Sequence, residues 1–102
     1  MIYYHATPKE NVFSIIREGI HASFDGVYLC KAAEDCLMFF LIYPDHAGKE
    51  IAVIPIDLDD EKIIESYDHN KEFIPCDAFI YPEDIPATKI PPLQDILLYK
   101  LM

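Results

Sequence analysis

Apolar side chains recur at helical spacing in the first quarter of the chain, which predicts an amphipathic helix over residues 8–18. These positions are Val12, Ile15, Ile16 and Ile20. Thr7 has the side chain of an N-cap, Pro8 suits the first helical position, and Glu10 completes a capping box. Gly19 is expected to end the helix, because glycine tolerates the backbone conformation that closes helices.

The remaining apolar runs are short, and turn-forming residues separate them. Residues 32–43 are apolar almost throughout, which predicts a buried helix. Pro55 interrupts the apolar run 51–57, so a bulge or an unpaired position is expected there. The acidic stretch 57–68 is expected to be a solvated loop or a short helix. The expected strands are 2–6, 27–29, 51–57 and 77–81, followed by 96–101 as a strand or a helix.

The order of these elements and the composition indicate one small α+β domain over residues 1–102. Hydrophobic residues make up 52% of the 102 positions and charged residues 25%, which is ordinary for a globular protein. A chain of this length buries a modest core, so we expect any ligand site to be an open cleft.

The charge is strongly negative, with 18 acidic against 8 basic residues and a net charge of −10. Nucleic-acid affinity depends on clustered basic residues, so the balance argues against direct nucleic-acid binding. It favours either simple solubility or attraction of a basic partner protein. The longest apolar run, 36–43, is far shorter than the ~20 residues that span a bilayer, so no membrane segment is expected.

Cysteine and histidine usage gives no sign of a disulfide framework or a metal site. Cys30, Cys36 and Cys76 are odd in number and form no CxxC pair, and the histidines lack metal-ligand spacing. The acidic stretch lacks the glycine and the closing glutamate of a calcium loop. With no basic leader at the start of the sequence, we expect a cytoplasmic protein and no bound metal.

Three residues are candidates for chemistry. His5 is expected at a strand end, where backbone pairing stops and a side chain can contact a ligand; it could equally pack between strand and helix. Tyr28 alternates with two apolar neighbours and is expected to face a cleft or the surface, as many strand tyrosines do. Asp77 opens a predicted strand, where a carboxylate could stabilise a developing cation or simply cap a turn.

The order of these segments resembles the ADP-ribosyltransferase-fold superfamily. The resemblance is to its histidine-bearing branch, which includes diphtheria-toxin-like and poly-ADP-ribose-polymerase-like enzymes, DarT and RNA 2′-phosphotransferase relatives. The matching segments are residues 4–7, 11–20, 26–29 with the helix that follows, 51–57, 77–81 and 85–86. The resemblance implies a split β-sheet with two helices and NAD as the substrate.

The resemblance also implies roles for individual residues. His5 matches the histidine that hydrogen-bonds the ribose beside adenine, and Thr7 lies where strand-end backbone meets the nicotinamide amide. Tyr28 matches a tyrosine that stacks on nicotinamide, and Phe39 falls near a second stacking aromatic. Asp77 stands where the family has glutamate and is one methylene shorter, and misplacement by ~1 Å can cost ~10²-fold in rate.

Three functions therefore remain open. The first is a mono-ADP-ribosyltransferase-like protein that transfers ADP-ribose to a protein or nucleic-acid acceptor and releases nicotinamide. The second is a catalytically inactive acidic module of the same fold that inhibits or regulates a basic partner protein. The third is an oligomeric domain whose tyrosines form an interface, since tyrosine is enriched at interfaces.

Overall fold

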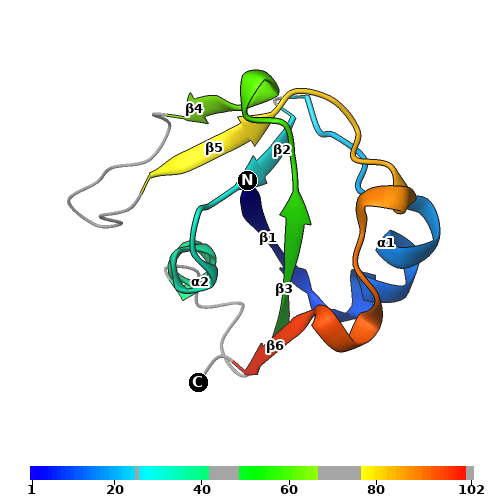
Figure 1. Cartoon of the computed structure of the whole chain (residues 1–102). Helices are drawn as coiled ribbons and strands as arrows, with labels where there is room; N and C mark the ends of the chain where they lie inside the picture. Colours follow the sequence, from blue (N-terminus) through cyan, green and yellow to red (C-terminus); the bar gives the residue numbers. More distant parts are fainter. Residues whose placement is uncertain (25, 42–48, 67–76, 101–102) are drawn as a thin grey trace.

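The computed structural model describes residues 1–24, 26–41, 49–66 and 77–100, without the side chains of residues 39–41. Two three-stranded antiparallel sheets and two α-helices make up the described fold (Figure 1). This confirms the predicted α+β class with a split β-sheet and two helices. The strands are β1 (Ile2–Pro8), β2 (Val27–Leu29), β3 (Glu50–Asp57), β4 (Ile64–Ser66), β5 (Ala78–Tyr81) and β6 (Leu97–Lys100), and the helices are α1 (Val12–Glu18) and α2 (Ala33–Leu41).

One backbone bridge holds the two sheets together. The first sheet has the order β1-β3-β6 and the second β2-β5-β4. Between them, the Tyr4 N–H donates to the Cys30 carbonyl at 2.8 Å, and the Cys30 N–H donates to the Tyr4 carbonyl at 2.9 Å. No further ladder pairs β1 with β2 in the described residues, so the sheet divides beside this bridge. The order across the divided sheet is β4-β5-β2-β1-β3-β6.

Two apolar clusters stabilise the fold on opposite faces of the first sheet. The larger cluster packs α1 against residues of both sheets, and fully buried Ile54 and Leu29 belong to it. The smaller cluster lies under α2 and includes Cys36, whose thiol contacts the Tyr4 carbonyl at 3.2 Å. Because apolar burial is the main favourable term in folding, these two clusters hold both helices against the sheets.

The predicted start of the first helix is wrong. β1 continues through Pro8 because Thr7 pairs with Ala52 and Pro8 with Ile51 across the sheet. A 3-10 turn, η1 (Lys9–Asn11), follows, and α1 begins only at Val12. The predicted capping box is therefore absent, and the Thr7 hydroxyl instead accepts a hydrogen bond from the Asn11 side-chain amide at 3.0 Å. Gly19 ends the helix as predicted, and its N–H donates to the Ile15 carbonyl.

Pro55 occupies an unpaired position, which is one of the two predicted outcomes. It lies opposite Tyr4, whose backbone N–H and carbonyl are both directed to Cys30. On its other side, β6 pairs only with residues 50–53. The missing N–H of Pro55 therefore removes no ladder hydrogen bond.

The acidic stretch contains more regular structure than predicted. A 3-10 turn, η3 (Asp60–Lys62), is the short helix that was one expectation, but β4 follows it as an additional strand. β4 forms because Ile64 and Ser66 pair with Ile80 and Ala78, a long-range contact that local composition does not report. Within the predicted segment 96–101, Leu97–Lys100 form strand β6 rather than a helix, and residue 101 lies outside the described part of the chain.

The other predicted elements agree closely with the structure. The second helix begins at Ala33, one residue later than predicted, and is described through Leu41; the rest of the predicted range 32–43 lies outside the described part of the chain. The 3-10 turns η4 (Ala87–Lys89) and η5 (Leu93–Asp95) follow Pro86 and Pro92. Among the described residues, no helix is both long enough and apolar enough to cross a membrane.

Candidate functional site

The His5 ring lies where the two sheets separate. The bridge between Tyr4 and Cys30 would, if it continued as a ladder, place Ala6 opposite Tyr28. At that position β1 and β2 are no longer paired, and the Tyr28 carbonyl instead contacts Nδ1 of His5 at 2.9 Å. The imidazole thus takes the place of a backbone partner at the division. The prediction that His5 lies at a strand end is wrong, because β1 continues through Pro8 and His5 pairs with Ile54 in β3. Only the pairing with β2 stops beside His5, after the Tyr4–Cys30 bridge.

The same contact sets the protonation of the ring. A carbonyl oxygen can only accept, so Nδ1 of His5 carries the proton and donates it to Tyr28. Burial of the imidazole lowers the pKa of His5, and the hydrogen bond to Tyr28 opposes this only in part. The ring is therefore neutral at pH 7, and Nε2 is left with a lone pair that can accept a hydrogen bond. No donor among the described residues contacts Nε2.

The backbone of Ala6 faces the division, whereas that of Thr7 faces the neighbouring strand. In an antiparallel strand, the N–H and carbonyl groups of alternate residues point to the same edge. Tyr4 directs both groups toward β2, so Ala6 directs its groups toward the same edge, which β2 has left. Thr7 is buried and directs its backbone groups toward Ala52 in β3.

Tyr28 has the exposure that its alternation predicted. Val27 and Leu29 are 2% and 1% exposed and belong to the core, whereas Tyr28 is 42% exposed on the opposite face of β2. Its carbonyl accepts the hydrogen bond from His5, so His5 contacts the backbone of Tyr28 rather than its phenol ring. Two candidates that are 23 residues apart in the sequence thus meet at the division of the sheet.

Asp77 is exposed and immediately precedes β5. Asp77 comes three residues before Ile80, and Ile80 is the direct partner of Tyr28. Three residues of extended chain separate Asp77 from that pair by about 10 Å along the strand. Continued along the strand, the β2–β5 register sets position 77 opposite Lys31, and the Lys31 amine lies 4.9 Å from the centre of the Phe79 ring. Strand alternation assigns position 77 to the Phe79 face, and Tyr28 to the other.

Phe39 lies on α2, the helix that follows β2, but its side chain is outside the described residues. Helix α2 packs over Cys30 and Val53, next to the division of the sheet. Arg17 lies on the surface of α1 beside Glu18.

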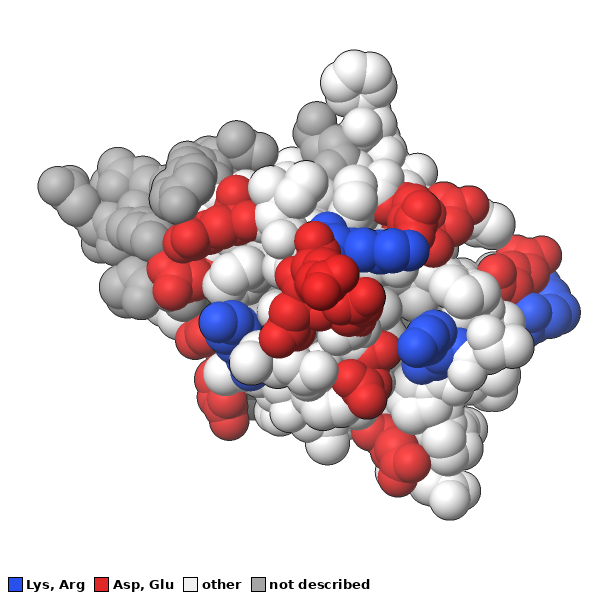
Figure 2. All heavy atoms as spheres, turned by 45° about the horizontal axis from the view of Figure 1, so that its top comes forward, with Lys and Arg blue, Asp and Glu red and all other residues white. Residues whose placement is uncertain are grey.

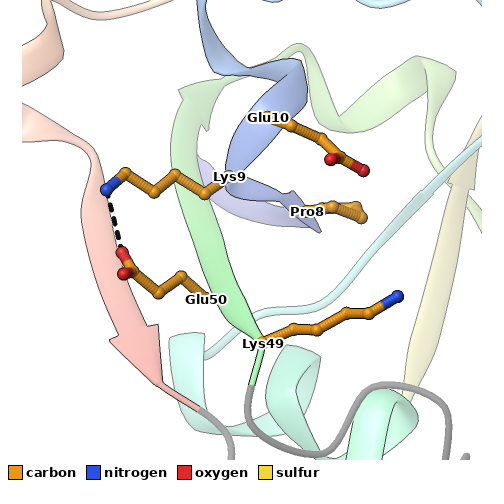
Figure 3. Close-up of a pocket in the computed structure, with 5 residues that line it drawn as sticks. All are labelled: Pro8, Lys9, Glu10, Lys49 and Glu50. Atoms are coloured by element: carbon orange, nitrogen blue, oxygen red, sulfur yellow. Dashed lines mark ion pairs between the residues drawn. The ribbon is translucent and has the colours of Figure 1, made fainter.

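A hollow of about 340 Å³ lies at the far end of β1 and contains none of the predicted site residues. It is lined by Pro8, Lys9, Glu10, Lys49 and Glu50. Figure 3 shows the Lys9 amine directed to the Glu50 carboxylate, and the two atoms are 2.9 Å apart. The lysines and glutamates of this hollow are equal in number, so it has no net charge to select an ion.

The described residues contain no candidate metal site. In residues 1–24, 26–41, 49–66 and 77–100, no group of three or more His, Cys, Asp or Glu side chains could hold a metal ion. The features that remain are the neutral His5 ring, the backbone of Ala6 and the exposed face of Tyr28.

Comparison with known proteins adds no name to this site. No protein-family model matches the chain, and no curated protein matches it.

Proposed function

We propose that this protein binds NAD at the division between β1 and β2 and transfers ADP-ribose to a macromolecular acceptor, releasing nicotinamide. The observation that carries the proposal is the 2.9 Å hydrogen bond from His5 Nδ1 to the Tyr28 carbonyl. It brings together two of the residues that the resemblance assigns to NAD, and it leaves Nε2 as an acceptor suited to a ribose hydroxyl.

The nicotinamide end of the ligand has two suitable partners here. The backbone N–H and carbonyl of Ala6 face the division and match the donor and acceptor of a carboxamide. The half-exposed Tyr28 ring offers a flat face for stacking on the nicotinamide ring. On this view Ala6, rather than Thr7, supplies the backbone groups, and Thr7 holds the turn after β1 through Asn11.

In the proposed reaction, the bond between the nicotinamide nitrogen and C1′ of the ribose breaks. Its electron pair stays on nicotinamide, whose ring loses its positive charge, and the ribose becomes cation-like. A lone pair of the acceptor forms the new bond to C1′, and the acceptor gives up a proton to solvent. The resemblance assigns the stabilisation of the cation-like ribose to the Asp77 carboxylate, which would have to reach the ribose from the Phe79 face of the sheet, opposite the face of Tyr28.

The test uses a replacement of His5 that separates the roles of its two nitrogens. Asparagine keeps a donor near the position of Nδ1, so His5→Asn is expected to retain the bond to Tyr28 and the wild-type thermal midpoint. It lacks Nε2, and we expect calorimetric NAD affinity to fall by about 3- to 10-fold, the effect of one hydrogen bond. Tyr28→Ala is expected to lose about 5-fold or more, because one stacked ring contributes ~1–3 kcal/mol. Tyr28→Phe, which keeps the ring, is the matched control.

Failure of wild type to bind NAD at millimolar concentration would overturn the NAD site. Released nicotinamide, measured in the same samples, tests transfer separately, and Asp77→Asn is expected to abolish the release. NAD binding without release would instead support the second candidate, a non-catalytic module that binds a basic partner. That candidate is favoured by the shorter carboxylate at Asp77 and by the exposed acidic residues around η3.

A further inference from the structure

An exposed apolar row crosses the outer face of the second sheet. Ile80 lies directly opposite Tyr28 on one side and directly opposite Ile64 on the other. Residues that are directly opposite in antiparallel strands project from the same face, so the three side chains form one row across β2, β5 and β4. Tyr28 is 42% exposed, Ile64 is 54% exposed, and Ile80 between them is half-buried.

The other face of β2 and β5 is buried. Val27, Leu29, Phe79 and Tyr81 all belong to the main core cluster. The row therefore lies outside the core, and its side chains are not among those that pack the two sheets together. Two strand spacings separate the ends of the row, about 10 Å, which is the length of about three residues of an extended segment laid along it.

Acidic residues border this row at the end where β4 begins and β5 finishes. They are Asp57, Asp59, Asp60 and Glu61 around η3, with Glu83 and Asp84 after β5. All of them are exposed. Figure 2 shows that red acidic side chains outnumber blue basic ones on the face reached by bringing the top of Figure 1 forward. Lys62 is the one basic side chain within these two segments, and it is paired with Glu83 at 2.8 Å.

The nearby hydrogen bonds keep two of these carboxylates charged. The Lys62 amine lowers the pKa of Glu83, and the Ala22 backbone N–H lowers the pKa of Asp84. A phosphate backbone approaching this border would be repelled, whereas lysine and arginine side chains would be attracted.

We propose that this apolar row and its acidic border form a docking surface for an extended, basic polypeptide segment of a partner protein. Apolar side chains of an extended segment can cover the row, and its long lysine and arginine side chains can extend beside the row to the border. The row begins at Tyr28. If the proposed function is correct, a segment bound here lies next to the nicotinamide end of NAD, and it is the acceptor of ADP-ribose. The acceptor is then a protein rather than a nucleic acid.

The probe is a short fluorescent peptide of alternating lysine and valine. A glutamate–valine peptide and an oligothymidylate, each labelled in the same way, represent the alternative ligands. Fluorescence anisotropy without NAD is expected to show binding of the lysine peptide alone. The affinity is expected to fall steeply toward 1 M salt, where the screening length shortens to about 3 Å. Equal binding of both peptides, stronger binding of the oligothymidylate, or an affinity unchanged by salt would overturn the proposal.

Two matched pairs of variants locate the surface. Ile64→Ser is expected to weaken the lysine peptide about fivefold, as the loss of partial burial of one side chain predicts, and Phe13→Ser is its control. Phe13 is also strongly exposed, at 71%, but lies on α1. Glu61→Lys is expected to weaken binding by at least as much, and Glu10→Lys, at the far end of β1, is the control. Equal losses in either pair would contradict the assignment.

The two proposals fail separately. Ile64 is not part of the proposed NAD site, so Ile64→Ser is expected to bind NAD as wild type does. If wild type does not bind NAD but the peptide results hold, the docking surface stands and the proposed function fails. If NAD binds but the lysine peptide does not, the docking surface is overturned.

Discussion

Gly19 is the position at which a single methyl group should damage the fold most clearly. Its φ of +83° and ψ of −168° fall in a region that is essentially restricted to glycine and costs other residues about 1–3 kcal/mol. A Cβ placed there would lie 2.2 Å from the Ile85 carbonyl oxygen and 2.8 Å from the Ala87 nitrogen. Both are backbone atoms, so no rotation of a side chain relieves the overlap.

The neighbouring backbone would have to move, and two hydrogen bonds would be lost with it. The Ile20 N–H donates to Ile85 at 2.8 Å, and the Ile85 N–H donates to Ile20 at 2.9 Å. Each bond contributes about 0.5–1.5 kcal/mol. Adding the backbone strain, we expect Gly19→Ala to lower the free energy of unfolding by about 2–6 kcal/mol, out of a typical ~5–15 kcal/mol for a domain of this size.

Thermal unfolding followed by circular dichroism measures this loss. A domain of about 100 residues loses ~4–8 °C for each kcal/mol, so the midpoint should fall by about 10 °C or more. Glu18→Ala, one residue earlier on the exposed side of α1, is the control and should shift the midpoint by no more than about 2 °C. A midpoint for Gly19→Ala within about 3 °C of wild type would refute the argument from backbone geometry.

Two further predictions concern charged groups. Because burial lowers the pKa of His5 in the folded state, the unfolded chain binds the proton more tightly, and stability should fall as the pH drops below about 6.5. Urea unfolding between pH 8 and pH 5 should therefore show a steeper loss for wild type than for His5→Asn, and superimposable profiles would contradict it. Lys62→Met removes an exposed ion pair, so the thermal midpoint should stay the same while the pKa of the Glu83 carboxyl, followed by NMR, rises toward its ordinary value. A large fall in the midpoint would show that this pair stabilises the fold.

The candidate site was only partly predictable from the sequence. The alternation of Tyr28 with Val27 and Leu29 correctly predicted which side chain stays exposed, because a strand with one buried face has a period of two. The contact between His5 and the Tyr28 carbonyl was not predictable, since it depends on where β1 and β2 separate. Nor did any local signal single out Ala6, whose backbone faces that division only because Tyr4 pairs with Cys30.

The sequence alone determined the features that depend on local chemistry. The period of Val12, Ile15 and Ile16 specified a helix, Gly19 specified its end, and the apolar run 51–57 specified a central strand. Only the tertiary structure decided how far the strands extend, because strand length depends on partners that are distant in the chain. Thr7 and Pro8 became part of β1 through Ala52 and Ile51, and β4 formed against β5 within a segment whose acidity indicated a loop or a short helix.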